Sequence, residues 1–215
     1  LLEITRSRIM PLHMAWSDKN HFDYLRKMGK DPGVNGAAFI VVLEGDKDMV
    51  ELEEKKVDEI VAKHGGKKLS YELAQHEWEE RSYEFRIREI GLASVPMDLT
   101  VPTYNFGKMA DDLYGLMKSM KMEGAIIGVM CDRNTVMFMP YYVYDPTSMS
   151  KSLTSLSFNY QGGELAKANG GRMLAGFGLF FGSTLKPVRG TGYDYLVAIK
   201  NALDPKEIMN PGKLL

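Results

Sequence analysis

Several features are scarce in this sequence, and each scarcity excludes a class of protein. Cys131 is the only cysteine in 215 residues, which excludes an intramolecular disulfide and a cysteine-based zinc cluster. The formal net charge is −1, so the basic bias of nucleic-acid-binding proteins is missing. No apolar run approaches the ~20 residues of a membrane-spanning helix. The four histidines all lie before residue 77.

These absences predict a cytoplasmic protein in a reducing compartment, because no signal peptide and no disulfide framework are visible. Hydrophobic residues make up 45% of the chain, enough to build the core of one or two domains. The sequence begins with leucine rather than methionine, so we expect a fragment of a longer polypeptide.

Hydrophobic periodicity predicts an alternation of helices and strands. The predicted strands cover 37–45, 97–101, 124–130, 135–144 and 172–181. The predicted helices cover 20–29, 47–63, 71–91, 108–120, 148–168 and 191–203. This order indicates an α+β domain in which helices cover one face of an antiparallel sheet. We therefore divide the chain into an irregular connector (1–36), an α+β domain (37–190), and a terminal helix with its tail (191–215).

The terminal segment reads as a packed helix followed by two turns. The apolar face of this helix is predicted to contain Leu196, Ile199 and Leu203. Asp204-Pro205 ends the helix, because proline lacks an N–H group and restricts the residue before it. Asn210-Pro211-Gly212 is a second turn signal. The tail should therefore hold Asn210 and Lys213 at a fixed place.

The motif Leu-Asp-Pro-x-x-Ile-x-Asn-Pro-Gly-Lys over 203–213 closely resembles the C-terminus of FAD-linked oxidases of the vanillyl-alcohol oxidase superfamily. Among these, it is most similar to the glycolate oxidase flavin subunit and to D-lactate and D-2-hydroxyglutarate dehydrogenases. The resemblance implies a ferredoxin-like substrate (cap) domain over 37–190, joined through 1–36 to an N-terminal FAD-binding domain that is absent here. It also implies that Asn210 and Lys213 border the flavin.

Trp78-Glu79-Glu80-Arg81 is similar to the family's Trp-x-x-Arg motif, whose arginine holds the substrate carboxylate. A planar guanidinium suits this role because it forms two parallel hydrogen bonds to a carboxylate. The resemblance therefore implies that Arg81 binds substrate, with Arg86 and Arg88 as competing candidates. The alternative is that Arg81 is an exposed helix residue paired with Glu77 or Glu84.

Asp98-Leu99-Thr100-Val101-Pro102 is similar to the family's Asp-x-x-x-Pro motif. The substrate-binding lysine that the family places just before this aspartate is Pro96 here. The family's dehydrogenases also carry Gly-His-x-Gly-Asp-Gly-Asn-x-His, whose histidines bind a divalent metal. Residues 128–136 retain Asp132 and Asn134, which the resemblance implies bind substrate, but valine replaces both histidines.

The family's Gly-Glu-His-Gly motif, which provides a third metal ligand and the catalytic base, reads Ala-Gly-Phe-Gly over 175–178. A metal site needs several donors at once, so we predict no metal. Instead we predict an apolar pocket beneath the flavin, with Phe177 as a substrate contact. The pocket would be lined by Val129, Val136, Met137 or Phe138, and Phe177. The histidines are expected to lie away from these strands.

The resemblance implies oxidation of a small hydroxy acid, such as D-lactate or glycolate, by hydride transfer to FAD. Tyr142 could replace the lost base, since phenol-oxidising relatives use tyrosines; the alternative is that Tyr141, Tyr142 and Tyr144 are ordinary strand aromatics. Two other functions stay open: an aryl-alcohol or phenol oxidase, and a non-catalytic flavin-fold subunit of an oxidase complex. A homo-oligomer is also compatible with the sequence.

Overall fold

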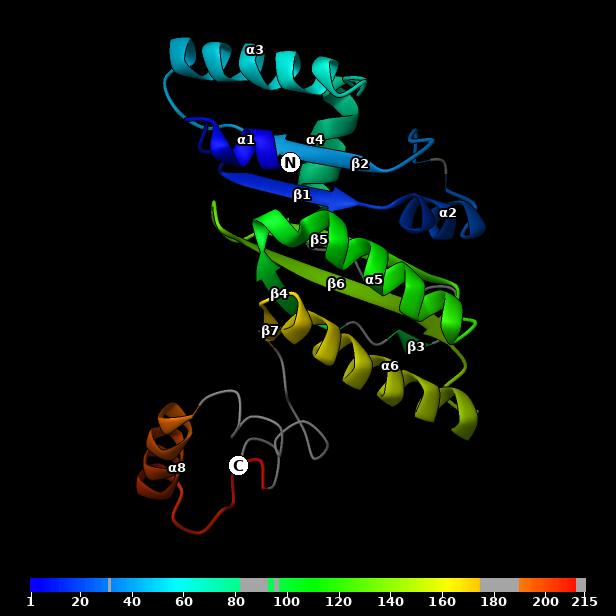
Figure 1. Ribbon diagram of the computed structural model, residues 1–215, viewed down its shortest axis with the longest axis vertical. Helices are drawn as coiled ribbons and strands as arrows, with labels where there is room; N and C mark the ends of the chain where they lie inside the picture. Colours follow the sequence, from blue (N-terminus) through cyan, green and yellow to red (C-terminus); the bar gives the residue numbers. More distant parts are fainter. Residues whose placement is uncertain (31, 82–92, 95–96, 175–189, 212–215) are drawn as a thin grey trace.

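The computed structural model describes residues 1–30, 32–81, 93–94, 97–174 and 190–211. Seven strands form an antiparallel sheet in the order β2-β1-β5-β6-β4-β7, with β3 paired to the end of β6 (Figure 1). The strands are β1 (His13–Ser17), β2 (Ala38–Val42), β3 (Ala93–Ser94), β4 (Leu99–Pro102), β5 (Gly124–Met130), β6 (Thr135–Tyr144) and β7 (Arg172–Met173).

The helices are α1 (Leu2–Arg6), α2 (Lys19–Lys27), α3 (Lys47–Lys63), α4 (Tyr71–Glu80), η2 (Thr103–Asn105), α5 (Phe106–Ser119), α6 (Met149–Ala168) and α8 (Thr191–Leu203). The predicted α+β order is confirmed, including the hairpin over 124–144. The predicted strand 172–181 is seen as β7, and its later part lies outside the described residues. The predicted helix 71–91 is likewise described only as far as α4.

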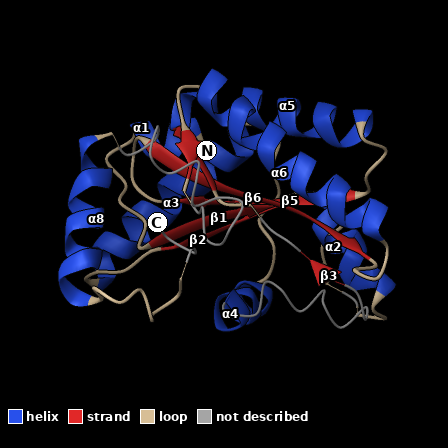
Figure 2. Ribbon diagram, turned by 90° about the horizontal axis from the view of Figure 1, so that it is seen from below, coloured by secondary structure: helices blue, strands red, loops and turns tan. Residues whose placement is uncertain are grey.

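Alternating side chains along β6 divide the sheet into two faces. Val136, Phe138 and Tyr142 point to the face that we call face A, where they pack with residues of α5 and α6. Met139 and Tyr141 point to the opposite side, face B, where they pack with Tyr24 of α2. Figure 2 shows α5 and α6 on one side of the sheet and α4 on the other.

The main core lies on face A, where side chains of strands and helices become fully buried. Its most buried members include Leu99, Val101, Met109, Leu113, Ile126, Val136, Phe138 and Phe158. Helix α6 continues through Gly162 and Gly163, where a Cβ atom would collide with Met97 or Met173. The glycine pair therefore lets α6 lie close to β4 and β7 at a modest cost in helix propensity.

The prediction of an irregular connector over 1–36 was wrong. Strand β1 lies inside the sheet, where His13–Ser17 pair with β2 and Ala15–Ser17 pair with β5. Helix α1 packs against α3 through Ile4 and Ile60, which are both buried. The sequence His-Met-Ala-Trp-Ser has no β-branched residue, so its strand conformation depends on partners far away in the chain.

The terminal helix was predicted correctly over 191–203, but the described structure does not show it packed. No residue of α8 is buried, and Leu203 is 80% exposed. Asp204 ends the helix as expected: its carboxylate accepts the backbone N–H groups of Ile208 and Met209 at 2.9 and 2.8 Å. Within the described part of the chain, every helix is too short or too polar to cross a bilayer.

Replacing Phe138 by alanine tests whether the face A core stabilises the domain. Its ring is fully buried and stacks on Phe106 with centroids 5.1 Å apart. We expect Phe138→Ala to lower the free energy of unfolding by about 3–5 kcal/mol, measured by urea denaturation. Phe39→Ala is the control, because Phe39 is 46% exposed; an equal loss in both variants would contradict the assignment.

Candidate functional site

Cross-strand pairing aligns one row of residues across face B. Ala15 pairs with Val129, Val129 with Met137, Met137 with Thr100, and Thr100 with Arg172. Directly opposed residues of antiparallel strands share a face of the sheet. The row therefore passes from apolar side chains to a hydroxyl and then to a guanidinium. Val129 and Met137 are half-buried, and Arg172 is exposed.

The register of this hairpin corrects one prediction about the apolar pocket. Val129 and Val136 were expected to line it together, but Val129 pairs with Met137 and Val136 pairs with Met130. Val136 and Phe138 are consequently in the face A core, because adjacent strand residues point to opposite faces. The apolar neighbour of Val129 on face B is therefore Met137 and not Val136. Phe177 lies outside the described residues.

Asp132 and Asn134, both predicted to bind substrate, lie in the turn between β5 and β6. The Asp132 carboxylate accepts the backbone N–H groups of Asn134 and Thr135, at 2.7 and 2.8 Å. This Asx-type turn orders the hairpin and directs the Asp132 oxygen toward its own backbone. Asn134 lines an open hollow at the end of the sheet.

The tyrosine predicted to be catalytic, Tyr142, points to face A. Its hydroxyl donates to the carbonyl of Lys151 at 2.8 Å, and its ring stacks on Tyr144. Burial raises the pKa of this phenol. Tyr142 is thus separated by the sheet from Val129 and Met137. The tyrosine that points to face B is its neighbour Tyr141.

Tyr141 is paired with a histidine that was expected to lie away from these strands. The Tyr141 hydroxyl lies 2.7 Å from Nδ1 of His21, and both side chains are buried. His21 is fixed on α2 because its backbone N–H donates to Asp18, the N-cap residue, at 2.8 Å. The N-cap signal of Asp18 is visible in the sequence, but the meeting of α2 with β6 is not.

A small cavity of ≈ 40 Å³ lies between α4 and face B, beside His21. Its ionisable lining residues are His13, His21, Glu77, Glu80 and Arg81. Burial and the nearby Arg81 lower the pKa of His13, so its imidazole is neutral at pH 7. Two of the four histidines thus reach this face, contrary to expectation. Among the described residues, no group of three potential ligands is placed to hold a metal ion.

Arg81, the predicted substrate-binding arginine, reaches this cavity from the end of α4. Its guanidinium lies 3.6 Å from the centre of the Trp78 ring and donates to the Trp78 carbonyl. Stacking on an aromatic face holds a guanidinium in a defined plane and leaves its other N–H groups along the edge. The competing candidates Arg86 and Arg88 lie outside the described residues.

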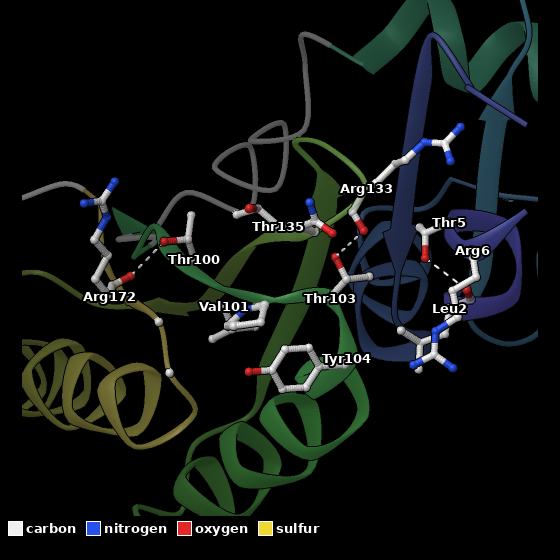
Figure 3. A pocket seen from close by; sticks show the side chains of 14 residues that line it. Leu2, Thr5, Arg6, Thr100, Val101, Thr103, Tyr104, Arg133, Thr135 and Arg172 are labelled. Atoms are coloured by element: carbon white, nitrogen blue, oxygen red, sulfur yellow. Dashed lines mark hydrogen bonds between the residues drawn. The ribbon is translucent and has the colours of Figure 1, made fainter. Parts of the chain in front are cut away.

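A second, larger hollow of about 980 Å³ opens at the end of the sheet where β6 and β7 begin (Figure 3). Its charged lining residues are Arg6, Arg133 and Arg172, and no acidic residue belongs to the described lining. Of the two residues expected to border a flavin, Asn210 is exposed beyond α8 with φ +50°, and Lys213 lies outside the described residues.

A comparison with known protein families shows to which family the chain belongs. A family model described as "FAD linked oxidases, C-terminal domain" matches residues 1–214. The chain belongs to this family. The match includes the first 36 residues, which agrees with the place of β1 inside the sheet.

Three solved structures share the fold of this chain at low sequence identity. Alkyldihydroxyacetonephosphate synthase is 15% identical with a TM-score of 0.60, over 98% of this chain and 40% of its own. p-Cresol methylhydroxylase is 14% identical with a TM-score of 0.67, and the match covers 94% of this chain and 46% of that protein. 4-Ethylphenol oxidase from Gulosibacter chungangensis is 9% identical with a TM-score of 0.67, and the match covers 94% of this chain and 47% of that protein. This chain thus spans less than half of each of these proteins.

The family implies FAD, and the described residues offer one feature that fits such a group and one that fits a neighbouring domain. Val129 and Met137 offer a half-buried apolar strip on face B, against which a planar ring system can pack. Ile199 and Leu203 of α8, with Ile208 and Met209 of the tail, are exposed apolar residues of the kind that a neighbouring domain covers.

Asp18→Asn tests the buried carboxylate that orients α2 and His21. Asp18 is 1% exposed, also accepts the Tyr114 hydroxyl at 2.9 Å, and has its pKa raised by burial. A raised pKa means that folding favours the protonated acid, so this contribution is present below the unfolded-state pKa and is lost as pH rises. Asparagine retains the helix cap without the charge.

We therefore expect the stability of Asp18→Asn relative to the unmodified protein to increase from about pH 3 to pH 7, the range in which an aspartate titrates. Urea unfolding at several pH values measures this difference. Asp46→Asn, at the exposed N-cap of α3, controls for removing one carboxylate. A difference that stays flat or falls with pH would show that Asp18 is not destabilised by burial.

Proposed function

We propose that this chain is the substrate domain of an FAD-dependent oxidoreductase that oxidises a small hydroxy acid of the D-lactate or glycolate type. The observation that carries this proposal is the placement of Arg81 and His21 around one small cavity on face B. The chemistry that FAD supplies when bound is acceptance of a hydride from a C–H bond next to oxygen. FAD itself would be held mainly by a separate N-terminal domain.

The size of the cavity and the presence of Arg81 favour a small acid. A volume of ≈ 40 Å³ accommodates about three water molecules, which suits a two- or three-carbon acid better than an aromatic ring. Arg81 can present the edge of its guanidinium to one carboxylate. Glu77 and Glu80 line the same cavity, so negative charge on them opposes any anion, and a doubly charged acid more strongly than a monoanion.

His21 is the group best placed to take the hydroxyl proton as the substrate is oxidised. It lines the cavity, and its Nδ1 is 2.7 Å from the Tyr141 hydroxyl. A hydrogen bond at one ring nitrogen selects the tautomer and hence the proton-accepting nitrogen. In this proposal Arg81 orients the carboxylate and His21 holds the proton. The apolar lining residues Leu25, Ile40 and Ile127 keep water away from the reacting carbon.

An aryl-alcohol or phenol substrate is the second candidate. It is favoured by the apolar strip of Val129 and Met137 and by Tyr141, which all point to face B. Two of the structural neighbours are named for phenolic compounds, p-cresol and 4-ethylphenol. An aromatic ring would need more room than the cavity beside Arg81 offers, so it would lie along the strip instead.

Anaerobic reduction of the flavin separates these functions. The full-length flavoprotein is mixed with D-lactate, glycolate or 4-hydroxybenzyl alcohol, and loss of the visible absorption of oxidised flavin is followed. We expect bleaching by a hydroxy acid. Bleaching by the aryl alcohol alone would favour the second candidate, and bleaching by none would contradict both and leave a non-catalytic flavin-fold subunit.

Arg81→Gln tests the carboxylate contact within the same assay. Losing a charge-assisted hydrogen bond to a carboxylate costs about 1.5–3 kcal/mol, so we expect KM for the hydroxy acid to rise about 10–100-fold. A smaller change in kcat is expected, because the carboxylate is bound alike in ground and transition states. Arg8→Gln is the matched control at an exposed arginine outside both cavities. An unchanged KM in Arg81→Gln would remove Arg81 from the site.

A further inference from the structure

Helix α6 has two apolar faces, of which one packs in the face A core and the other points outward. The inner face includes Phe158 and Ala166, which are both fully buried. The outer face, which we call the outer stripe, consists of Met149, Leu153, Leu156 and Tyr160. Leu156 is half-buried, and the other three side chains are 57–73% exposed. A contiguous exposed apolar patch of this kind is typical of a contact surface.

The spacing of the outer stripe places its members along one side of the helix. Successive members are four, three and four residues apart, so their side chains fall within a sector of roughly 60°. From Met149 to Tyr160 the stripe is roughly 16 Å long. The order of the steps is the same when read from either end. A second copy of α6 that runs antiparallel therefore presents a matching row of apolar side chains.

The segment that carries the outer stripe has no charged residue. All twelve residues of 152–163 are uncharged, whereas ten of the 17 residues of α3, another surface helix, are charged. Charged residues are depleted at the centre of protein interfaces. In a two-fold interface the same surface lies on both sides, so a charged stripe would repel its own copy. The absence of charge is thus compatible with a second copy of this chain as the partner.

The ends of α6 are complementary in such an antiparallel pair. A two-fold axis between Leu153 and Leu156 sets each of these leucines opposite the other and each end of the stripe opposite the other end. Glu164 then lies near the start of the partner's α6, where unpaired N–H groups carry partial positive charge. Within its own helix Glu164 pairs with Lys167 at 2.6 Å and is half exposed. Its charge therefore favours the antiparallel orientation.

The outer stripe lies on the side of the sheet opposite the apolar strip that fits a flavin. Figure 2 shows α6 on the same side as α5, across the sheet from α4. Val129 and Met137 point to face B, so an N-terminal domain packed on them would lie across the sheet from α6. Helix α5 lies along one flank of α6 (Figure 1), and the outer stripe is exposed in the described part of the chain.

We propose that two copies of this chain associate through α6, with their outer stripes packed antiparallel about a two-fold axis. Ser152 and Ser157 flank the stripe on either side, and such small side chains let two helices approach closely. A stripe of one helix is smaller than a standard interface of about 800 Å² per partner. We therefore expect a reversible dimer that dissociates on dilution.

Sedimentation velocity of the full-length flavoprotein across the micromolar concentration range tests this pairing. Leu153→Glu should raise the dissociation constant of the dimer at least about 10-fold, because it places two like charges beside the two-fold axis. Leu52→Glu is the matched control and should leave association unchanged. Leu52 is 61% exposed on α3, and Leu153 is 57% exposed on α6.

A mixture of two variants separates association from folding. Leu153→Lys alone should weaken the dimer as Leu153→Glu does. An equimolar mixture of the two variants should form dimers again, because opposite charges then meet across the axis. Mixing cannot restore a dimer that was lost because the variants are unfolded.

Three results would overturn the proposal: an unmodified protein that stays monomeric, a dimer that Leu153→Glu leaves intact, or a mixture of variants that stays monomeric. A fall in flavin content in monomeric Leu153→Glu, but not in Leu52→Glu, would show that the N-terminal domain covers the stripe, and would overturn it too. Because turnover of a hydroxy acid is not measured, the outcome is independent of the proposed reaction.

Discussion

The pairing of β5 with β6 is the constraint on which the rest of this structure depends. The register that joins Val129 to Met137 decides which side chains enter the face A core and which remain on face B. A shift of one residue would move Val136 and Phe138 out of the core and bring Met137 into it. The Asx turn at Asp132 holds this register at the closed end of the hairpin. Core packing and the candidate site are therefore two consequences of the same set of hydrogen bonds.

The two concave sites differ in both size and charge. The cavity between α4 and face B is small and mixes carboxylates, imidazoles and the Arg81 guanidinium. The hollow at the end of the sheet is wide and has only arginines as charged members of its described lining. A mixed site can hold and exchange a proton, because neutral and charged groups lie side by side. A purely cationic one attracts anions without offering a group that titrates near neutral pH.

The motif resemblance identified the family, and the tertiary structure decided on which face of the sheet several of the predicted residues lie. Tyr142 lies in the face A core, while Tyr141 points to face B and pairs with His21. The two tyrosines are adjacent in the sequence, so no composition or motif argument separates them. Only the strand register does, because it sets which of two neighbouring residues points to each face. His13 and His21 reach face B for a similar reason, since β1 inserts between β2 and β5.

By itself, the sequence determined the hairpin, the helices over 47–63 and 191–203, the α+β class and the resemblance to FAD-linked oxidases. These follow from local periodicity, turn residues and short motifs, which act over a few neighbouring positions. The tertiary structure alone decided the place of β1, the two faces of the sheet and the meeting of Arg6, Arg133 and Arg172 at one hollow. Those features depend on pairing between segments far apart in the chain, whose partners local sequence patterns do not specify.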